Sequence, residues 1–305
     1  MFKTLFVLAL AIISGFYIIA WTFLARKNRR SAQATGGSAP EPVVPSPFQA
    51  FIGFFANFLD TLGIGSFATT TSIFKLGRMV RDEQVPGTLN VGHALPTITE
   101  ACIYITIVQV DIRTLLIMIA AAVLGSWFGA GIVSHWPRRN VQIGMGLALL
   151  SLATLMLLSM FQLLPLGGSS LGLSGALLWA GALGNFALGA LMTIGIGLYA
   201  PCMVLVYMLG MQPLAAFPIM MGSCAFLMPI GSIQFIRNNR YNLRAALGLA
   251  LGGIPGVLLA AYLVKSLPLD YVRWLVVIVV LYTATRMLHS ARVERAGALA
   301  TEVAK

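Results

Sequence analysis

Two acidic side chains stand inside long apolar runs, where an ionisable group is costly and therefore points to a function. Asp60 follows the apolar residues that begin at Phe48, and Glu100 lies in the middle of the run that begins at Pro86. At membrane depth such a carboxyl group must face a cavity, find a partner or stay protonated. We expect these carboxyl groups to carry protons across the membrane. The alternative is a protonated carboxyl bonded to a backbone carbonyl that a helix break leaves free.

A histidine stands near the second of these acids. His93 precedes Glu100 by seven residues, which is two helical turns, so the two side chains share a face if Pro96 does not disturb the helix. Histidine can take part in a proton path, but a neutral histidine packed between helices fits the sequence equally well. The proton-coupling candidates are therefore Asp60, Glu100 and His93.

A pair of glycines and a cluster of hydroxyls follow Asp60. The order is Gly63-Ile64-Gly65 and then Ser66, Thr69, Thr70 and Thr71. Glycines let a helix unwind, and unwound backbone at membrane depth is tolerated only where protein or a water-filled cavity satisfies it. A helix that restarts at Ser66 would direct free N–H groups and its positive dipole end at an anion. The alternative is that the hydroxyls only hydrogen-bond to one another within a helix bundle.

The same pattern recurs in the second half of the chain. TLGIGSFA at 61–68 reads against TIGIGLYA at 193–200, and two further glycine-containing matches follow at offsets of about 127 to 132 residues. Such ordered matches indicate a duplication, which is typical of secondary transporters. Two helix ends that meet at the repeat interface would form one anion site. This predicts the substrate-binding residues Gly63, Gly65, Ser66, Thr69, Thr70, Gly195, Gly197, Tyr199 and Cys202.

The composition indicates that the elements carrying these residues are membrane helices. The 305 residues are 58% hydrophobic and 10% charged, with a mean hydropathy of +0.88, whereas soluble domains carry about 25% charged residues. Apolar runs long enough to span a bilayer recur along the chain, without the short alternating segments of a membrane β-barrel. The predicted fold class is all-α, a polytopic membrane helix bundle with two internal repeats that each open with a glycine-broken helix or hairpin.

The apolar runs and the segments between them divide the chain into five parts. We expect an N-terminal transmembrane span at 1–25, a cytoplasmic Pro/Gly-rich linker at 26–47, two transporter repeats at 48–170 and 171–290, and a cytoplasmic tail at 291–305. The 20 Lys and Arg residues lie between apolar runs, where topology anchors stand. The net charge of +11 therefore does not indicate a nucleic-acid partner.

The distribution of basic residues favours one of two topologies. If both broken stretches are hairpins that enter and leave on the same side, 16 basic residues are cytoplasmic and 4 are outside. If each stretch crosses the membrane once, the split is 12 against 8. The hairpin arrangement obeys the positive-inside rule better and leaves each half with three full crossings, so the halves would be inverted relative to each other.

Motifs for catalysis and for metal binding are absent. The sequence contains no GxxxxGK[ST], HExxH or GxSxG pattern, so neither an enzyme nor a cofactor is predicted. Cys102, Cys202 and Cys224 lie in apolar runs without CxxC spacing, which predicts neither a disulfide nor a metal site. We interpret them as small packing residues, with Cys202 also a candidate to face the substrate.

The two glycine-broken stretches carry a family resemblance. GFFANFLDTLGIGSFATTT and GNFALGALMTIGIGLYAP resemble the paired motifs of the sulfite exporter TauE/SafE family, also described as domain of unknown function 81. So do GSWFGAGIVSHWPRRNVQIGMGLALL and its weaker counterpart around GGIPGVLLAAYLV. The resemblance covers residues 48–288, behind the N-terminal span and linker. It implies a bacterial inner-membrane carrier for small anions such as sulfite, organosulfonates or small carboxylates.

The expected function is thus secondary transport of a small anion, driven by the proton gradient. The expected partners are the anion and the lipid bilayer, with no nucleic acid, and the sequence leaves a homo-oligomer open. A passive anion channel would need a continuous polar lining, which the few polar residues in the apolar runs disfavour. The other alternative is a non-catalytic membrane subunit of a larger complex.

Overall fold

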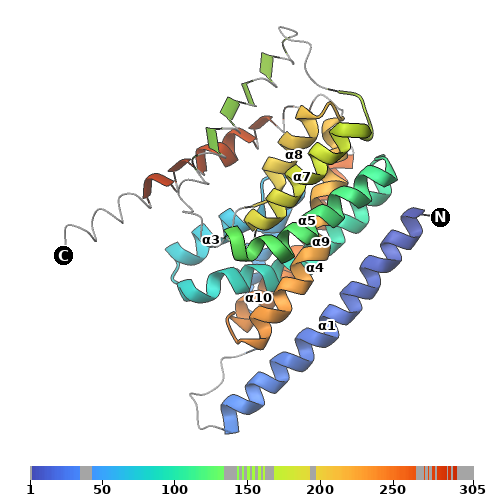
Figure 1. The fold of residues 1–305 in the computed structure, drawn as a ribbon. Helices are drawn as coiled ribbons and strands as arrows, with labels where there is room; N and C mark the ends of the chain where they lie inside the picture. The colour runs from blue at the N-terminus through green and yellow to red at the C-terminus, as the bar shows by residue number, and fades with distance from the viewer. Residues whose placement is uncertain are drawn as a thin grey trace. The chain divides into compact units, whose positions relative to one another are not determined.

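The fold is known from a computed structural model that describes residues 2–34, 43–133, 168–192 and 197–265, with short stretches and single positions between 143 and 161 and between 271 and 293. Apart from an isolated β-bridge, the regular secondary structure of these residues is helical, as predicted (Figure 1). Four helical segments in this part of the chain are long and apolar enough to cross a membrane: Lys3–Ser31, Gly175–Met192, Pro213–Arg237 and Leu243–Leu263.

The helices follow one another in two similar series behind a long first helix, α1 (Phe2–Ala34). The first series is α2 (Pro47–Thr61), α3 (Ser66–Leu76), the short 3-10 helix η1 (Asp82–Gln84), α4 (Val85–Ile107) and α5 (Ile112–Val133). The second is α7 (Gly175–Met192), α8 (Tyr199–Met208), η2 (Pro213–Ala215), α9 (Ala216–Arg237) and α10 (Leu243–Lys265). In each series a broken apolar stretch precedes a long helix with an internal proline, Pro96 in α4 and Pro229 in α9.

Helix α1 is longer than the sequence predicted. It continues past the expected boundary at residue 25, through the basic cluster Arg26–Arg30, and ends at Ala34 (Figure 1). Arg, Lys, Ala and Gln are good helix formers, and no glycine or proline occurs between Ala25 and Gly36. The linker predicted from residue 26 is therefore helical as far as Ala34.

The chain forms two compact units, and each takes helices from both predicted repeats. Unit 1 consists of Met1–Gln109 and Met221–Ser266, and unit 2 of Val110–Met220 and Leu267–Lys305. In unit 1 the last helix of the second series, α10, packs on the first helix of the first series, α2. In unit 2, α5 packs in the same way on α7. Unit 1 thus contains α10 and most of α9 from the second series, and unit 2 contains α5 from the first.

Glycines bring α2 and α10 into close backbone contact in unit 1. A Cβ added at Gly53 of α2 would lie 2.7 Å from the carbonyl oxygen of Gly248, and one at Gly252 would overlap the carbonyl oxygen of Ala50. Gly248, Gly252 and Gly256 recur every four residues and so share one face of α10. This small-residue face allows the helix axes to approach closely in a membrane, where apolar burial drives helix association little.

The broken stretch of unit 1 enters and leaves at the same end of the unit. The start of α10 and the loop before it contact residues just before and just after the broken stretch. Arg244 Nε donates to the Val44 carbonyl oxygen at 3.0 Å, and the Asn242 backbone N–H donates to Thr88 Oγ1 at 2.9 Å. Ile52 of α2 and Phe74 of α3 also share one buried cluster. Helix α3 therefore runs back along α2, and the stretch is a hairpin.

The broken stretch of unit 2 closes in the same way. The Gln212 N–H donates to the Ser170 carbonyl oxygen at 2.8 Å, and an isolated β-bridge joins Ser170 to Met211. These residues precede α7 and follow α8, so the chain enters and leaves at neighbouring positions. The Asp111 N–H, just before α5, donates to the Leu171 carbonyl oxygen at 2.7 Å at this same end.

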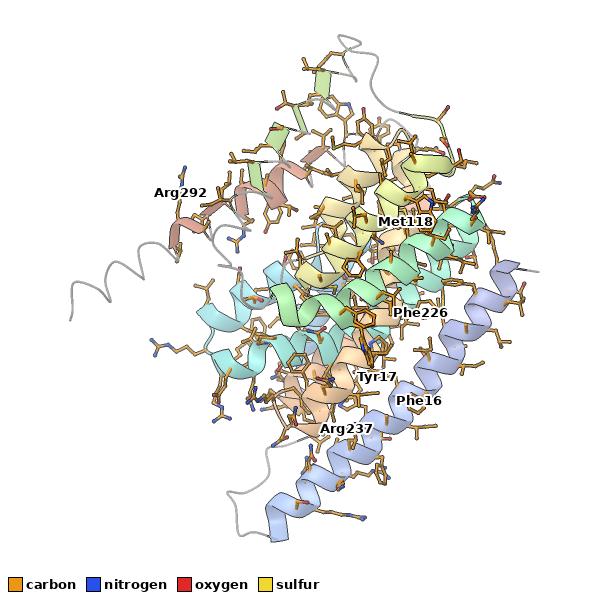
Figure 2. The ribbon with its side chains drawn as sticks, in the orientation of Figure 1. Phe16, Tyr17, Met118, Phe226, Arg237 and Arg292 are labelled. Carbon is orange, nitrogen blue, oxygen red and sulfur yellow. The ribbon has the colours of Figure 1, made fainter. Side chains whose placement is uncertain are left out.

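Polar contacts near the start, in the middle and near the end of helix α1 hold it against unit 1. Lys3 Nζ donates to the carbonyl oxygens of Thr106 and Val108 at 3.0 and 3.2 Å, at the C-terminal end of α4. Tyr17, directed from α1 towards the other helices of unit 1 in Figure 2, donates its hydroxyl to the Val91 carbonyl oxygen at 2.9 Å. Asn28 Nδ2 donates to the carbonyl oxygen of Ile236 at 2.7 Å. The basic end of α1 thus lies beside the loop that follows α9, and Lys3 lies at the opposite end.

Because the hairpin ends, the basic end of α1 and the α9–α10 loop lie together, we expect positions 84 and 238 to face the cytoplasm. The measurement is single-cysteine labelling of Gln84→Cys and Asn238→Cys, in a background without Cys102, Cys202 and Cys224. Ser169→Cys should be labelled from outside. His135, outside the described residues, is also expected on the cytoplasmic side. Labelling of position 84 from outside would contradict this topology.

Candidate functional site at the broken helix of unit 1

The break between α2 and α3 is a glycine-dependent turn. The Gly63 N–H donates to the Asp60 carbonyl oxygen at 2.7 Å, and the Ile64 N–H donates to that of Leu59 at 3.0 Å. This pair of bonds is the Schellman pattern, which satisfies two of the carbonyl groups left free at a helix end. Gly63 has φ +94° and Gly65 has φ +88°, values that side chains rarely adopt. The two glycines therefore end α2 and redirect the chain into α3.

Asp60 caps the start of α3. Its Oδ1 accepts the Ser66 backbone N–H at 2.7 Å, and its Oδ2 accepts the Ser66 hydroxyl at 2.9 Å. Both residues are buried, with 3% of their surface exposed. The sequence predicted free N–H groups here, at the positive end of the helix dipole. In this structure the carboxyl group of Asp60 occupies the position predicted for the anion, so an anion bound at the start of α3 would lie beside Asp60.

Glu100 reaches the other helix of the hairpin, α2. Its Oε1 lies 2.9 Å from the Thr61 hydroxyl, which also lies 2.7 Å from the Asn57 carbonyl oxygen. Tyr104, one turn further along α4, donates its hydroxyl to the Thr61 carbonyl oxygen at 3.1 Å. Glu100 is fully buried. Its carboxyl group therefore has a hydroxyl partner at the C-terminal end of α2.

His93 lies between the two arms of the hairpin. Its Nδ1 is 3.0 Å from Asn57 Oδ1 in α2, and its Nε2 is 3.1 Å from Thr70 Oγ1 in α3. Helix α4 continues through Pro96, so His93 and Glu100 both reach α2. The imidazole ring is fully buried, and its centroid lies 6.0 Å from that of Phe67.

Thr69 differs from its neighbours in α3. Its Oγ1 is buried and has no hydrogen-bond partner among the described residues, whereas Ser66 and Thr70 are bonded to Asp60 and His93. A buried hydroxyl without a partner is rare in native proteins and calls for an explanation. Among the substrate-binding hydroxyls predicted in α3, the Thr69 hydroxyl is thus the one without a hydrogen-bond partner among the described residues.

The second break belongs to unit 2. Gly195 lies outside the described residues, and Gly197 precedes α8, whose side chains Tyr199 and Cys202 are buried. A Cβ added at Gly197 would have no atom within 4 Å. That these residues form one anion site together with the first break stays a prediction.

Sequence reasoning missed three residues of this region, Asn57, Thr61 and Tyr104. A signal for Asn57 was present, because both motifs quoted above contain an Asn-Phe pair, at Asn57 and at Asn185. Asn185 Nδ2 donates to the Met118 carbonyl oxygen of α5 at 2.7 Å, so both asparagines are buried at helix contacts. Thr61 stands four residues after Asn57, hence on the same face of α2.

Long apolar helices indicate a multi-pass helical membrane protein, and buried polar groups at a broken hairpin are typical of transporters. The chain belongs to the sulfite exporter TauE/SafE family, whose family model matches residues 1–156 and 176–304. The match begins at residue 1, so it includes the N-terminal helix and linker, which the resemblance from residue 48 onward left out. Neither a curated protein nor a solved structure matches the chain.

Proposed function

We propose that the protein is a secondary transporter that moves a small anion across the bacterial inner membrane and couples this movement to the proton gradient. The proposed substrates are sulfite, an organosulfonate or a small carboxylate, in keeping with the family. The observation that carries the proposal is the Asp60 carboxyl group, bonded to the first N–H of α3 at the break. This is the position at which a helix attracts an anion.

Competition between the substrate and Asp60 would provide the coupling. Two unit charges about 4 Å apart repel by about 4 kcal/mol at an effective dielectric constant of about 20. An anion at the start of α3 would therefore favour the uncharged form of Asp60, so that anion and proton bind together. The unpartnered Thr69 hydroxyl and the open backbone at Gly65 would supply further contacts to the anion.

The second series would complete the site. Gly195, Gly197, Tyr199 and Cys202 are the proposed contributions from unit 2, and Glu100 is the second proposed proton carrier. The recurrence of helix order and length in the two series supports a duplication, and the two hairpins support an inverted relation between the halves. The lipid bilayer is the surrounding partner, and a homo-oligomer is left open.

The amide variants Asp60→Asn and Glu100→Gln test the coupling, because they keep the shape of each side chain and remove its titration. We expect at least one of them to lose anion flux driven by a pH gradient while it still exchanges anion in a counterflow assay. The measurement uses purified protein in liposomes. Glu83→Gln is the matched control, since this carboxylate is exposed and pairs with Arg81 at 3.2 Å. Wild-type pH dependence in both single variants and in the double variant would refute the assignment.

The same liposomes separate the alternative functions. A saturable flux that responds to the pH gradient supports a carrier, and a flux that rises without saturation supports a passive channel. Absence of flux from the correctly inserted wild-type protein would favour a non-catalytic subunit of a larger complex.

A further inference from the structure

We infer that His93 is a neutral bridge that holds the two arms of the broken hairpin together, and that Asn57 is the residue that sets its tautomer. The inference rests on the proposed function only where its test uses transport. His93 stands on α4, and its two ring nitrogens reach different arms of the hairpin, α2 through Asn57 and α3 through Thr70.

The hydrogen bonds of Asn57 determine where the protons lie. Its Nδ2 is 2.7 Å from the Gly53 carbonyl oxygen, and only the NH₂ group of an amide can donate to a carbonyl. Its Oδ1 therefore faces His93 Nδ1, at 3.0 Å. Because an amide oxygen only accepts, Nδ1 must carry a proton. In a neutral imidazole Nε2 is then an acceptor, and Thr70 donates to it.

Packing from α10 supports this orientation of Asn57. A Cβ added at Gly253 would lie 2.5 Å from Asn57 Nδ2 and 2.5 Å from Pro96 Cγ. The absence of a side chain at Gly253 thus makes room for the asparagine amide beside α4. Asn57 is itself fully buried, so its amide group depends on these protein partners.

Among the described residues, no charged group forms a hydrogen bond with His93. Its hydrogen-bond partners among the described residues are an amide and a hydroxyl. The nearby carboxyl groups of Asp60 and Glu100 bond to Ser66 and Thr61 instead. Helix α10 carries no ionisable residue between Arg244 and Tyr262, and α1 meets α4 here through the Tyr17 hydroxyl. Lys75 is the only charged residue in the sequence of α3.

This arrangement distinguishes His93 from the other two candidates for proton coupling, Asp60 and Glu100. A buried imidazolium without a counter-charge is costly, whereas the neutral ring satisfies both arms of the hairpin. His93 and Asn57 are therefore positioning residues that maintain the geometry of the break, and titration is left to Asp60 and Glu100.

Two substitutions distinguish a bridge from a proton carrier. Glutamine at position 93 cannot titrate, but its amide can donate to Asn57 Oδ1 and accept from Thr70, so His93→Gln should keep pH-driven flux and its pH profile. His93→Leu loses both bonds and leaves Asn57 Oδ1 and the Thr70 hydroxyl without their partner, so it should disturb the break and reduce flux about tenfold or more. Loss of pH-driven flux in His93→Gln with exchange intact would overturn the bridge, and so would wild-type flux in His93→Leu.

A spectroscopic test is independent of transport and remains decisive if the proposed function fails. The chain has 3 histidines, so His135→Gln and His289→Gln leave His93 as the only one. The ¹⁵N chemical shifts of its ring, in labelled full-length protein, should report a neutral imidazole protonated at Nδ1. Asn57→Leu removes the acceptor that faces Nδ1 and should lose this tautomer. An Nε2-protonated ring or an imidazolium at neutral pH in the protein with Asn57 intact would overturn the inference.

Discussion

Replacing Gly252 with leucine is expected to prevent unit 1 from assembling, which is the largest effect on stability that we predict. A side chain at this position would overlap the Ala50 carbonyl oxygen, which is backbone and cannot turn aside. The neighbouring contact is also tight, because a Cβ at Gly248 would lie 2.7 Å from Gln49 Cβ. Overpacking in a well-packed core costs about 1–3 kcal/mol, and here α2 and α10 would have to separate along their length.

The measurement is the yield of monodisperse protein and its apparent thermal unfolding temperature in detergent. Gly15→Leu in α1 is the matched control, since Gly15 is exposed in a helix and an added Cβ has no atom within 4 Å. We expect Gly252→Leu to lose most of the folded fraction, Gly252→Ala to be intermediate and Gly15→Leu to resemble wild type. A Gly252→Leu protein with wild-type yield and unfolding temperature would show that α2 and α10 do not pack as described.

Gly65→Leu is expected to abolish anion flux while much of the protein stays folded. Gly65 has φ +88°, in the left-handed region, where a side chain costs roughly 1–2 kcal/mol. The space beside it is open, with no atom within 4 Å of an added Cβ. Leucine would therefore strain the break and fill the space through which we propose that the anion reaches the backbone of α3.

Comparison with the second break separates strain from obstruction. Gly197 has equally open surroundings and no positive φ, so Gly197→Leu fills space without backbone strain. We expect Gly197→Leu to insert normally and to reduce flux, because Gly197 is one of the residues that we propose contact the anion. The measurement is uptake into liposomes, scaled to the amount of correctly inserted protein. Full flux in a correctly inserted Gly65→Leu variant would refute a site at this glycine.

Several features of the protein follow from the sequence because they depend on local physics. Apolar runs of membrane length predict helices whatever their neighbours, and the two glycines at 63 and 65 predict the break that separates α2 from α3. The depth of Asp60 and Glu100 also follows from the apolar residues on either side of them. The extra length of α1 was missed, although its helix formers were visible, because the basic cluster was interpreted as the end of a membrane span.

Other features depend on which helix faces meet, and only the tertiary structure decided them. The sequence suggested two successive repeats, but α10 packs on α2 and α5 on α7, because the small residues on these helices match across the series. The packing of α10 places Gly253 against Asn57, where the missing side chain leaves room for the amide that contacts the His93 ring. The partner of Asp60 was likewise hidden, since the five residues 61–65, which include the glycine-rich turn, lie between Asp60 and Ser66. The two hydrogen bonds of His93 link side chains on α2, α3 and α4, so they form only when all three helix backbones are in place. Periodicity along one helix does not supply that information.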